Sequence, residues 1–310
     1  MKTQIKRRAS WERKKNFVRS GITEVRITAE PHDGQRFFQP VTKIWQVNRE
    51  MVLLAAGGRA LLMQLAHPKV AAGVADHSRF QEDPFGRLYR TMSTMWSIVF
   101  DERSEAVAAL ERVDSIHKKV HGIVLGSETL HAGARYDAFD QELLLWVHAT
   151  LIDSAMIAYD RFVAPLQEAD RKNYYGDSRK LARLFGIEET IIPSGLMEFG
   201  QYMKQMLTGD TIVVGPTARS LAQDILHARP WIFKPAGPLF RFVTAGLLPE
   251  KLRHGYELNW STHKEKLFLL LAAVIRSALP LVPSPLRIVP NARAAEKAFR
   301  RQSMVARKAD

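Results

Sequence analysis

Apolar residues recur at spacings of three and four along most of the chain, which is the pattern of amphipathic helices. The helices that this pattern predicts span residues 41–66 (interrupted at Gly57-Gly58), 87–100, 140–162, 179–185, 195–227 (broken at Gly209 and Gly215) and 258–279. Alternating patterns are confined to VRITAE (25–30) and TIVVG (211–215), and there is no internal repeat. We therefore expect an all-α fold, a single globular multi-helix domain for which a globin-like core is one option.

The segment after residue 100 predicts a further helix. Ser104, followed by Glu105, has the character of an N-cap with an acidic first turn. One apolar stripe then continues at helical spacing, which places His117 facing the core; its members are Ala106, Leu110, Val113, His117, Val120 and Val124. Three glycines between 122 and 133 predict a loop after it, and the Pro- and Gly-rich residues 228–253 predict irregular structure or short helix.

The charge of +13 is concentrated at the two ends of the chain. We divide the sequence into a basic N-terminal tail (1–38), a helical domain (39–290) and a basic C-terminal helix or tail (291–310). Such ends favour a solvated surface, with peripheral contact to an anionic membrane as the alternative, and we expect no specific nucleic-acid partner. The oligomeric state is left open.

The most apolar run, residues 267–275, is too short to cross a bilayer, and we expect it to pack in the core rather than lie on a membrane. No secretory signal is expected, because the basic start is not followed by an apolar segment of the usual length. We therefore predict a cytoplasmic protein, with membrane association as the alternative. The chain has no cysteine, which excludes disulfides, thiolate metal sites and covalent haem attachment.

Candidate catalytic and ligand-binding residues are concentrated in one stretch, RALLMQLAHPKVAAGVADHSRFQEDPFGRLYRT (residues 59–91). Arg87 and Thr91 are four residues apart and therefore share a helix face. His117 interrupts an apolar stripe, and its register keeps His121, one turn later, on the same face. Imidazole is the usual protein ligand of b-type haem iron, so either histidine could serve; we prefer His117. An ordinary helix ion pair between Arg87 and Asp83 is an equally weighted alternative.

This stretch, together with IHKKVHG (116–122) and YDAFDQELLLWVHATLIDS (136–154), resembles the family of the oxygenase MpaB and the catalytic domain of the rubber-cleaving latex clearing proteins. The resemblance implies a haem b cofactor, with His117 as the iron ligand and Arg87 and Thr91 in the active site. It also implies dioxygen and a small apolar, often isoprenoid, substrate that is cleaved at a double bond. Arg90 stands where the rubber-cleaving enzymes are expected to have lysine, which argues against a lysine-capped iron and against rubber cleavage itself.

Three further histidines are candidates for the haem environment, although a core or capping role is favoured for each. His67 precedes Pro68 and is expected to end a helix, and His77 is expected in a turn, near a distal pocket or a propionate. His148 is expected on the apolar face of a helix.

Other catalytic classes lack their motifs. A di-iron carboxylate bundle requires paired Glu-x-x-His motifs, and only Glu128-x-x-His131 fits, in a glycine-flanked segment. The sequence has no HExxH, no phosphate-binding loop and no GxSxG. Our leading hypothesis is a haem b-dependent oxygenase, and the alternative is a non-catalytic protein of the same fold that binds haem or an apolar ligand.

Overall fold

The computed structural model describes residues 35–77, 84–125, 132–226 and 237–309. Its first elements are α2 (Lys43–Asn48), the 3₁₀ helix η1 (Met51–Ala56), α3 (Gly57–Leu65), α4 (Pro68–His77), α5 (Pro84–Phe100), α6 (Arg103–His117), β1 (His121–Ile123), β2 (Arg135–Asp137) and α7 (Gln141–Phe162). The remainder are α8 (Glu168–Leu184), α9 (Leu196–Thr208), α10 (Pro216–Leu226), α11 (Gly237–Leu247), α12 (Glu250–Gly255), α13 (Thr262–Ala278), η3 (Leu279–Leu281), α14 (Ser284–Arg287) and α15 (Pro290–Ala309). The all-α prediction is confirmed, since the only described sheet is one two-stranded hairpin.

Helix α7 is the central element of the core. Asp140 caps it by accepting a hydrogen bond from the Glu142 backbone N–H at 3.1 Å. The helix packs against α3, η1, α13 and α8, and Trp146, Ala149 and Ala158 are fully buried along it. Within the described part of the chain, α7 is the one helix long and apolar enough to cross a membrane, but here other helices surround it. Its apolar character is therefore that of a core helix.

Several boundaries predicted from prolines and glycines are confirmed. The helix before His67 ends at Leu65 and α4 starts at Pro68. Gly209 ends α9, Pro216 starts α10, and Gly186 follows α8 with a positive φ of 80°. The predicted 179–185 helix is the last part of the longer α8, whose polar first half carries little apolar signal.

The prediction for residues 41–66 was wrong about where the helix is interrupted. It is divided into α2, η1 and α3, and Gly57 and Gly58 begin α3 instead of interrupting a helix. The glycines do permit close packing, as expected: a Cβ at Gly58 would lie 2.1 Å from the Thr244 Oγ1 of α11. Absence of a side chain at residue 58 is therefore required for α3 and α11 to meet.

The segment around His117 also differs from the prediction. Glu102, not Ser104, is the N-cap of α6, and its backbone N–H donates to Glu105 at 3.4 Å, half of a capping box. Helix α6 ends at His117, so the expected stripe does not reach Val120. Beyond it lies the antiparallel β1–β2 hairpin, in which Gly122 pairs with Tyr136, where a loop was predicted. His121 therefore lies on a strand, and the shared helix face with His117 was wrong.

Of the two predicted alternating segments, TIVVG is not a strand, while VRITAE lies outside the described residues. The expectation that residues 267–275 pack in the core was half wrong. Phe268 and Ala272 are buried, but Leu267, Leu270 and Val274 on the other face of α13 are each more than half exposed.

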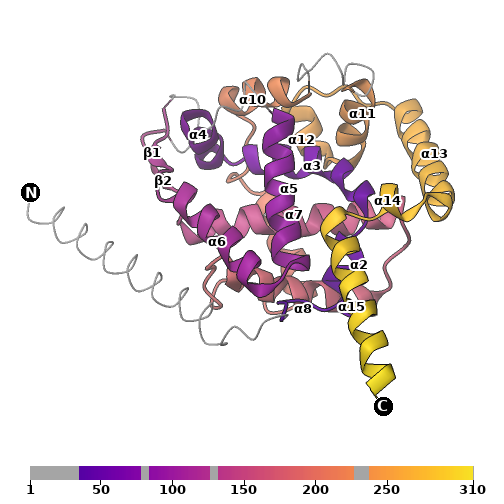
Figure 1. The fold of residues 1–310 in the computed structure, drawn as a ribbon. Coiled ribbons are helices and arrows are strands. Elements are labelled where there is room, and N and C mark those ends of the chain that lie inside the picture. Colours follow the sequence, from indigo (N-terminus) through magenta and orange to yellow (C-terminus); the bar gives the residue numbers. More distant parts are fainter. Residues whose placement is uncertain (1–34, 78–83, 126–131, 227–236, 310) are drawn as a thin grey trace, which may run out of the picture.

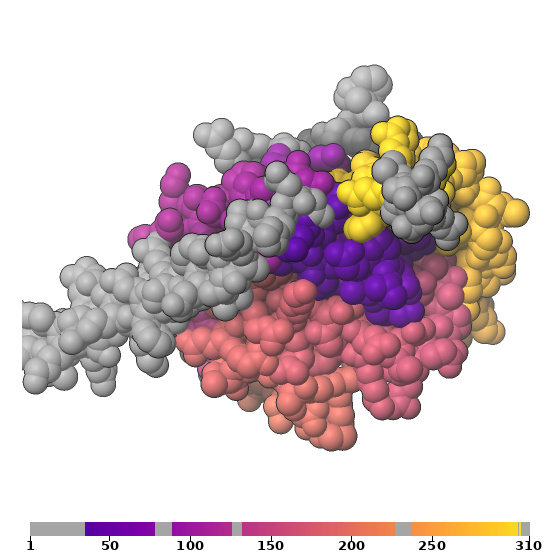
Figure 2. All heavy atoms as spheres, turned by 60° about the horizontal axis from the view of Figure 1, so that its bottom comes forward, coloured from indigo at the N-terminus to yellow at the C-terminus, as the bar shows by residue number. Residues whose placement is uncertain are grey.

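The two ends of the described chain are joined to each other. Glu50 forms an isolated antiparallel bridge with Ile288, and the Arg287 guanidinium donates to both Glu50 carboxylate oxygens, at 2.9 and 3.0 Å. Further on, the Trp45 indole N–H donates to Glu296 of α15 at 3.2 Å. Figure 2 shows the C-terminal segment (yellow) lying against the N-terminal helices (indigo). The helix predicted for the C-terminus is thus a packed part of the fold along its first half.

Candidate functional site

Helices α5 and α6 form a helical hairpin with a two-residue connection, and they carry the residues implied by the family resemblance. Arg87 lies in the second turn of α5, and its side chain, like Asp83, lies outside the described part of the structure. Thr91 and Arg90 are exposed, so this part of α5 presents a polar face to solvent. The neighbouring face carries Met92 and Met95 and points inward. One helix therefore carries both the Arg-Thr pair and an apolar wall.

His117 is the last residue of α6 and is half-buried. Its ring lies edge-on to Phe139, with ring centroids 5.9 Å apart. Burial lowers the pKa of His117, and the nearby carboxylates of Asp114 and Asp137 oppose this shift. The imidazole is therefore neutral at neutral pH, which is the form that binds a metal. The described contacts include no hydrogen bond or ion pair between His117 and α5.

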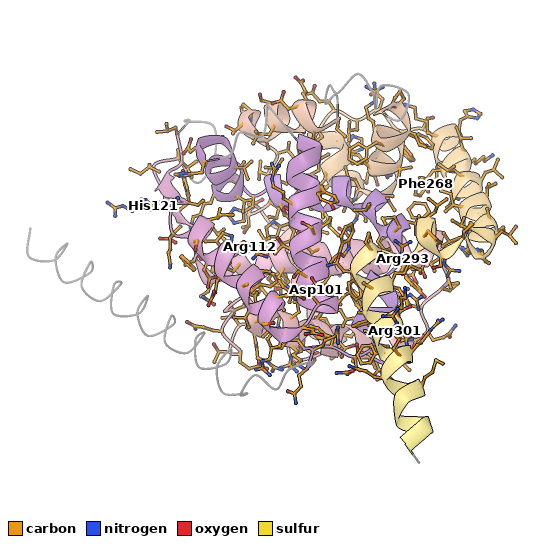
Figure 3. All side chains as sticks on the ribbon, in the orientation of Figure 1. Asp101, Arg112, His121, Phe268, Arg293 and Arg301 are labelled. Carbon is orange, nitrogen blue, oxygen red and sulfur yellow. The ribbon has the colours of Figure 1, made fainter. Side chains whose placement is uncertain are left out.

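His77 and His121 come together at the β hairpin. The His77 Nε2 lies 3.1 Å from the His121 carbonyl oxygen, and the two ring centroids are 6.4 Å apart. Beside them the Tyr136 hydroxyl donates to the Asp76 carboxylate at 2.5 Å. His77 ends α4 instead of lying in a turn, and both histidines are exposed, His121 at the outer edge of the molecule (Figure 3).

His67 and His148 occupy two other places. The His67 Nδ1 accepts the Lys69 backbone N–H at 3.3 Å, so this buried histidine caps the start of α4. His148 is buried on α7, where burial lowers its pKa to about 4 and its hydrogen bond with the Ser178 backbone partly opposes this. The structure thus brings together only His77 and His121 among the five candidate histidines.

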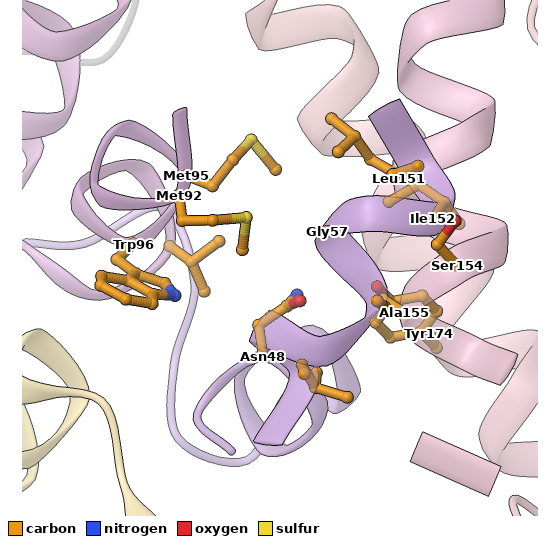
Figure 4. A pocket seen from close by; sticks show the side chains of 14 residues that line it. Asn48, Gly57, Met92, Met95, Trp96, Leu151, Ile152, Ser154, Ala155 and Tyr174 are labelled. Atoms are coloured by element: carbon orange, nitrogen blue, oxygen red, sulfur yellow. The ribbon is translucent and has the colours of Figure 1, made fainter. Parts of the chain in front are cut away.

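A cavity of about 40 Å³ lies between η1, α3, α5 and α7 (Figure 4). Its lining consists of Asn48, Leu53, Ala56, Gly57, Ala60, Met92, Met95, Trp96, Val99, Leu151, Ile152, Ser154, Ala155 and Tyr174. Three of these side chains are polar, Asn48, Ser154 and Tyr174, and none is a histidine. Sequence reasoning missed these three, because single polar residues in three separate helices form no motif.

A buried arginine holds one of those polar groups. Arg59 is 2% exposed, and it donates to the Ser154 hydroxyl at 2.6 Å, to the Asp153 carboxylate at 2.5 Å and to the Leu247 carbonyl at 2.9 Å. These bonds join α3, α7 and α11 directly beside the cavity. The sequence could have indicated this pair, because it has a single Arg within one apolar helix and an Asp-Ser pair within another. Buried charges are normally paired, so a buried arginine requires an acidic partner.

The cofactor that the resemblance implies can be compared with these residues. Within the described ranges no three His, Asp or Glu side chains gather as a metal site, and Glu128 and His131 lie outside those ranges. Haem iron needs only one protein ligand, a neutral and partly buried imidazole, and His117 has these properties. The donor chemistry of His117 therefore fits haem, whereas the 40 Å³ cavity is a separate space suited to a small ligand.

Comparison with known proteins gives the family. Residues 44–277 match the model of the catalytic domain of the ER-bound oxygenase mpaB/B′ and rubber oxygenase. The chain belongs to this oxygenase family. The match extends from α2 to the end of α13, so it includes the cavity lining and all five candidate histidines.

Two mycobacterial relatives share this domain, and their names give no activity. Uncharacterized proteins of Mycobacterium bovis and of Mycobacterium tuberculosis are each 28% identical to this chain over 240 residues. The aligned region covers 75% of this chain and 90% of each relative. This oxygenase-family domain thus makes up most of these relatives too.

Proposed function

We propose that this chain is a haem b-dependent oxygenase that uses dioxygen to oxidise a small apolar substrate of isoprenoid type. Membership in an oxygenase catalytic-domain family supports the reaction class. The observation that carries the haem part of the proposal is the neutral, half-buried imidazole of His117.

In this proposal His117 would hold the iron of a bound haem through its neutral ring. A bound haem supplies the iron at which dioxygen binds. Arg87 offers a permanent positive charge to a propionate or to bound oxygen, and the exposed Thr91 hydroxyl can donate a hydrogen bond. His77 would be a distal-pocket or propionate-binding group in the same hypothesis, and His121 the alternative iron ligand.

The substrate would enter the apolar cavity beside Met92 and Met95, on the turns of α5 that follow Thr91. Apolar side chains there exclude water, which strengthens polar interactions next to them. Helix α5 would in this way connect the oxygen-binding end with the substrate-binding wall.

The first experiment is the ultraviolet–visible spectrum of the full chain, expressed with adequate haem, for wild type, His117→Ala and His121→Ala. We expect a Soret band in wild type and His121→Ala that is lost in His117→Ala, with circular dichroism confirming that all three are folded. A Soret band retained in His117→Ala would overturn the ligand assignment. Wild-type protein with neither a Soret band nor iron would overturn the haem proposal.

The alternative is a protein that binds haem or an apolar ligand without turnover. Measurement of dioxygen uptake distinguishes it from the oxygenase. The exposed Arg90 in place of lysine fits the oxygenase and the binding protein equally. Haem-loaded protein that consumes dioxygen only in the presence of an isoprenoid substrate would support the oxygenase. Haem-loaded protein that binds such a molecule without consuming dioxygen would support the alternative.

A further inference from the structure

We propose that the cavity between α5 and α7 selects an apolar molecule that carries one oxygen, an alcohol or a carbonyl, and that the Tyr174 hydroxyl binds this oxygen. The inference rests on the proposed function, because it names the chemical class of the substrate that the proposed oxygenase would bind.

The first support is a buried hydroxyl without a partner. Tyr174 is 0% exposed, lines the cavity, and its hydroxyl has no hydrogen-bond partner. The Asn48 amide lies near enough to favour the ionised phenol, yet no hydrogen bond of normal geometry joins them. Burial outweighs this and raises the pKa of Tyr174, so the phenol keeps its proton and can donate it. Buried polar groups normally have partners, and a ligand oxygen would supply this one.

Ser154 supplies the second support. Its oxygen accepts the Arg59 guanidinium N–H at 2.6 Å, which turns the hydroxyl proton elsewhere. Ser154 is 2% exposed, and the described contacts give its proton no acceptor. Two buried donors in one cavity call for an acceptor in the ligand, and a hydrocarbon offers none.

The other residues that line the cavity indicate that the rest of the ligand is apolar. Apart from Asn48 they are aliphatic, aromatic or glycine, and Ala56, Gly57, Ala60 and Ala155 leave space along α3 and α7. The cavity of about 40 Å³ exceeds the ~10–15 Å³ that a buried water needs but is smaller than the ~150 Å³ of a cavity that holds benzene, so a longer ligand requires the lining side chains to move. Met92 and Met95 are half-buried and flexible, so they can adjust to a slender chain.

The test compares two ligands of one carbon skeleton, geranial and the hydrocarbon 2,6-dimethyl-2,6-octadiene. Calorimetric titration of the full chain without dioxygen measures binding in the absence of turnover. We expect wild type to prefer geranial, and Tyr174→Phe to bind geranial about five- to tenfold more weakly while hydrocarbon binding is unchanged. Equal loss for both ligands, no loss, or no binding to wild type would overturn the proposal.

Tyr256→Phe is the matched control. The Tyr256 hydroxyl is buried and donates to the Leu62 carbonyl at 2.6 Å. We therefore expect Tyr256→Phe to lower the Tm of the free protein and leave ligand preference unchanged, and Tyr174→Phe to do the reverse. A Tm drop in Tyr174→Phe as large as the control would show that its hydroxyl already has a partner, against the proposal. Because binding is read without dioxygen, loss of the Soret band or of turnover would contradict only the proposed function.

A separate observation concerns the outer face of α13, from which we infer that α13 and α14 dock on an anionic lipid surface. Exposed apolar side chains, between 42% and 84% exposed, are Leu267, Leu269, Leu270 and Val274 on α13, Leu281 at the end of η3 and Leu286 on α14. The opposite face packs inward through the buried Phe268 (Figure 3). A large exposed apolar face on a folded domain marks an interaction site.

The charges around this face suit anionic lipid. No acidic residue occurs between Leu267 and Arg293. Arg276 within it donates to the Arg161 carbonyl at 3.0 Å and is turned toward the protein. Along the sequence, basic residues precede and follow this stretch: Lys264 and Lys266 at the start of α13, and Arg293, Lys297, Arg300 and Arg301 on α15. The two acidic residues among them are bound within the protein, Glu265 by the Trp260 indole and Glu296 by Arg49. An apolar strip with basic borders is the arrangement of interfacial helices on anionic membranes.

Flotation with vesicles tests the docking. Full-length protein is mixed with vesicles of phosphatidylcholine and phosphatidylglycerol, or of phosphatidylcholine alone, at low and high salt. We expect preference for the anionic vesicles, and about tenfold or greater loss of partitioning at high salt in Leu270→Glu/Val274→Glu. The control Ile116→Glu/Met197→Glu alters apolar residues that are 62% and 68% exposed on other helices, and it should bind as wild type does.

Two results would overturn this inference. One is vesicle binding that the α13 substitutions leave unchanged. The other is a dimer in solution, by sedimentation, that only those substitutions dissociate, because a second copy would then cover the face.

Discussion

The cavity beside α7 and the histidine-rich end at the β hairpin are built in opposite ways. Around the cavity the polar groups are buried and held by contacts across three helices, as Arg59 and Ser154 are. At the hairpin end His77 and His121 are exposed, and their contacts are local. The polar groups at the cavity therefore stabilise the fold and, in our proposal, also bind the ligand, whereas we expect that those at the hairpin can change without loss of the core. Substitutions should separate the two regions by the size of their effect.

The largest effect is expected at the buried ion pair. Arg59→Ala leaves the Asp153 carboxylate without its 2.5 Å partner and should lower the free energy of unfolding by about 3–5 kcal/mol. Urea denaturation measures this. Arg183→Ala, which removes an exposed pair with Glu189, should change it by about 0–1 kcal/mol. Equal effects of the two substitutions would contradict the proposed contrast.

A pH dependence should come from the buried His148. Its pKa is about 4 in the folded protein against 6.5 ordinarily, so the unfolded state binds more protons between these values. Stability should fall as pH drops from 6.5 to 4, by up to about 3 kcal/mol from this residue. In His148→Gln the slope over this window should be smaller, as read by thermal unfolding at several pH values. The exposed His254→Gln should keep the wild-type slope.

Close packing at Gly58 should show a smaller effect. A Cβ there meets Thr244 at 2.1 Å and Phe240 at 2.9 Å, so Gly58→Ala should push α3 from α11 and destabilise by about 1–3 kcal/mol. Gly176→Ala is the control, because nothing lies within 4 Å of its Cβ on α8, and it should stabilise by about 0.5–1 kcal/mol. Stabilisation by both would mean that Thr244 and Phe240 move aside at little cost and that helix propensity, not space, decides the result.

The smallest effect is expected at the hairpin end. Tyr136→Phe removes the hydrogen bond to the exposed Asp76 but keeps the ring that covers Gly122, and it should destabilise by about 1 kcal/mol. Chemical denaturation beside Arg59→Ala gives the comparison directly. A loss of 3 kcal/mol or more would show that this end is as tightly coupled to the core as the cavity is.

The sequence predicted the helical class and the elements with a strong local signal. Helix α7 was predicted to within one residue because apolar residues recur at helical spacing along its 22 residues. The end of α6 was missed because Val113, His117 and Val120 keep helical spacing across the point where the chain turns into β1. Periodicity does not record where backbone hydrogen bonds stop.

The candidate site was predictable only where residues are close in sequence. Arg87 and Thr91 lie on one helix as expected, and the placement of His67 between two helices followed from Pro68. Tyr174, Asn48 and Ser154 come together from three helices through tertiary packing. No local pattern encodes such a meeting. The roles of His117, Arg87 and Thr91 stay predictions.

The bridge between Glu50 and Ile288 has a consequence for synthesis on the ribosome. The chain emerges from its N-terminus, so α2 and η1 leave the tunnel more than 200 residues before Arg287 and Glu296 arrive. Until then the Glu50 carboxylate, 5% exposed in the finished fold, has no guanidinium to enter the interior with. The nascent chain must therefore keep α2 and η1 in a hydrated, unfinished state, and the domain closes only after α14 and α15 have left the ribosome.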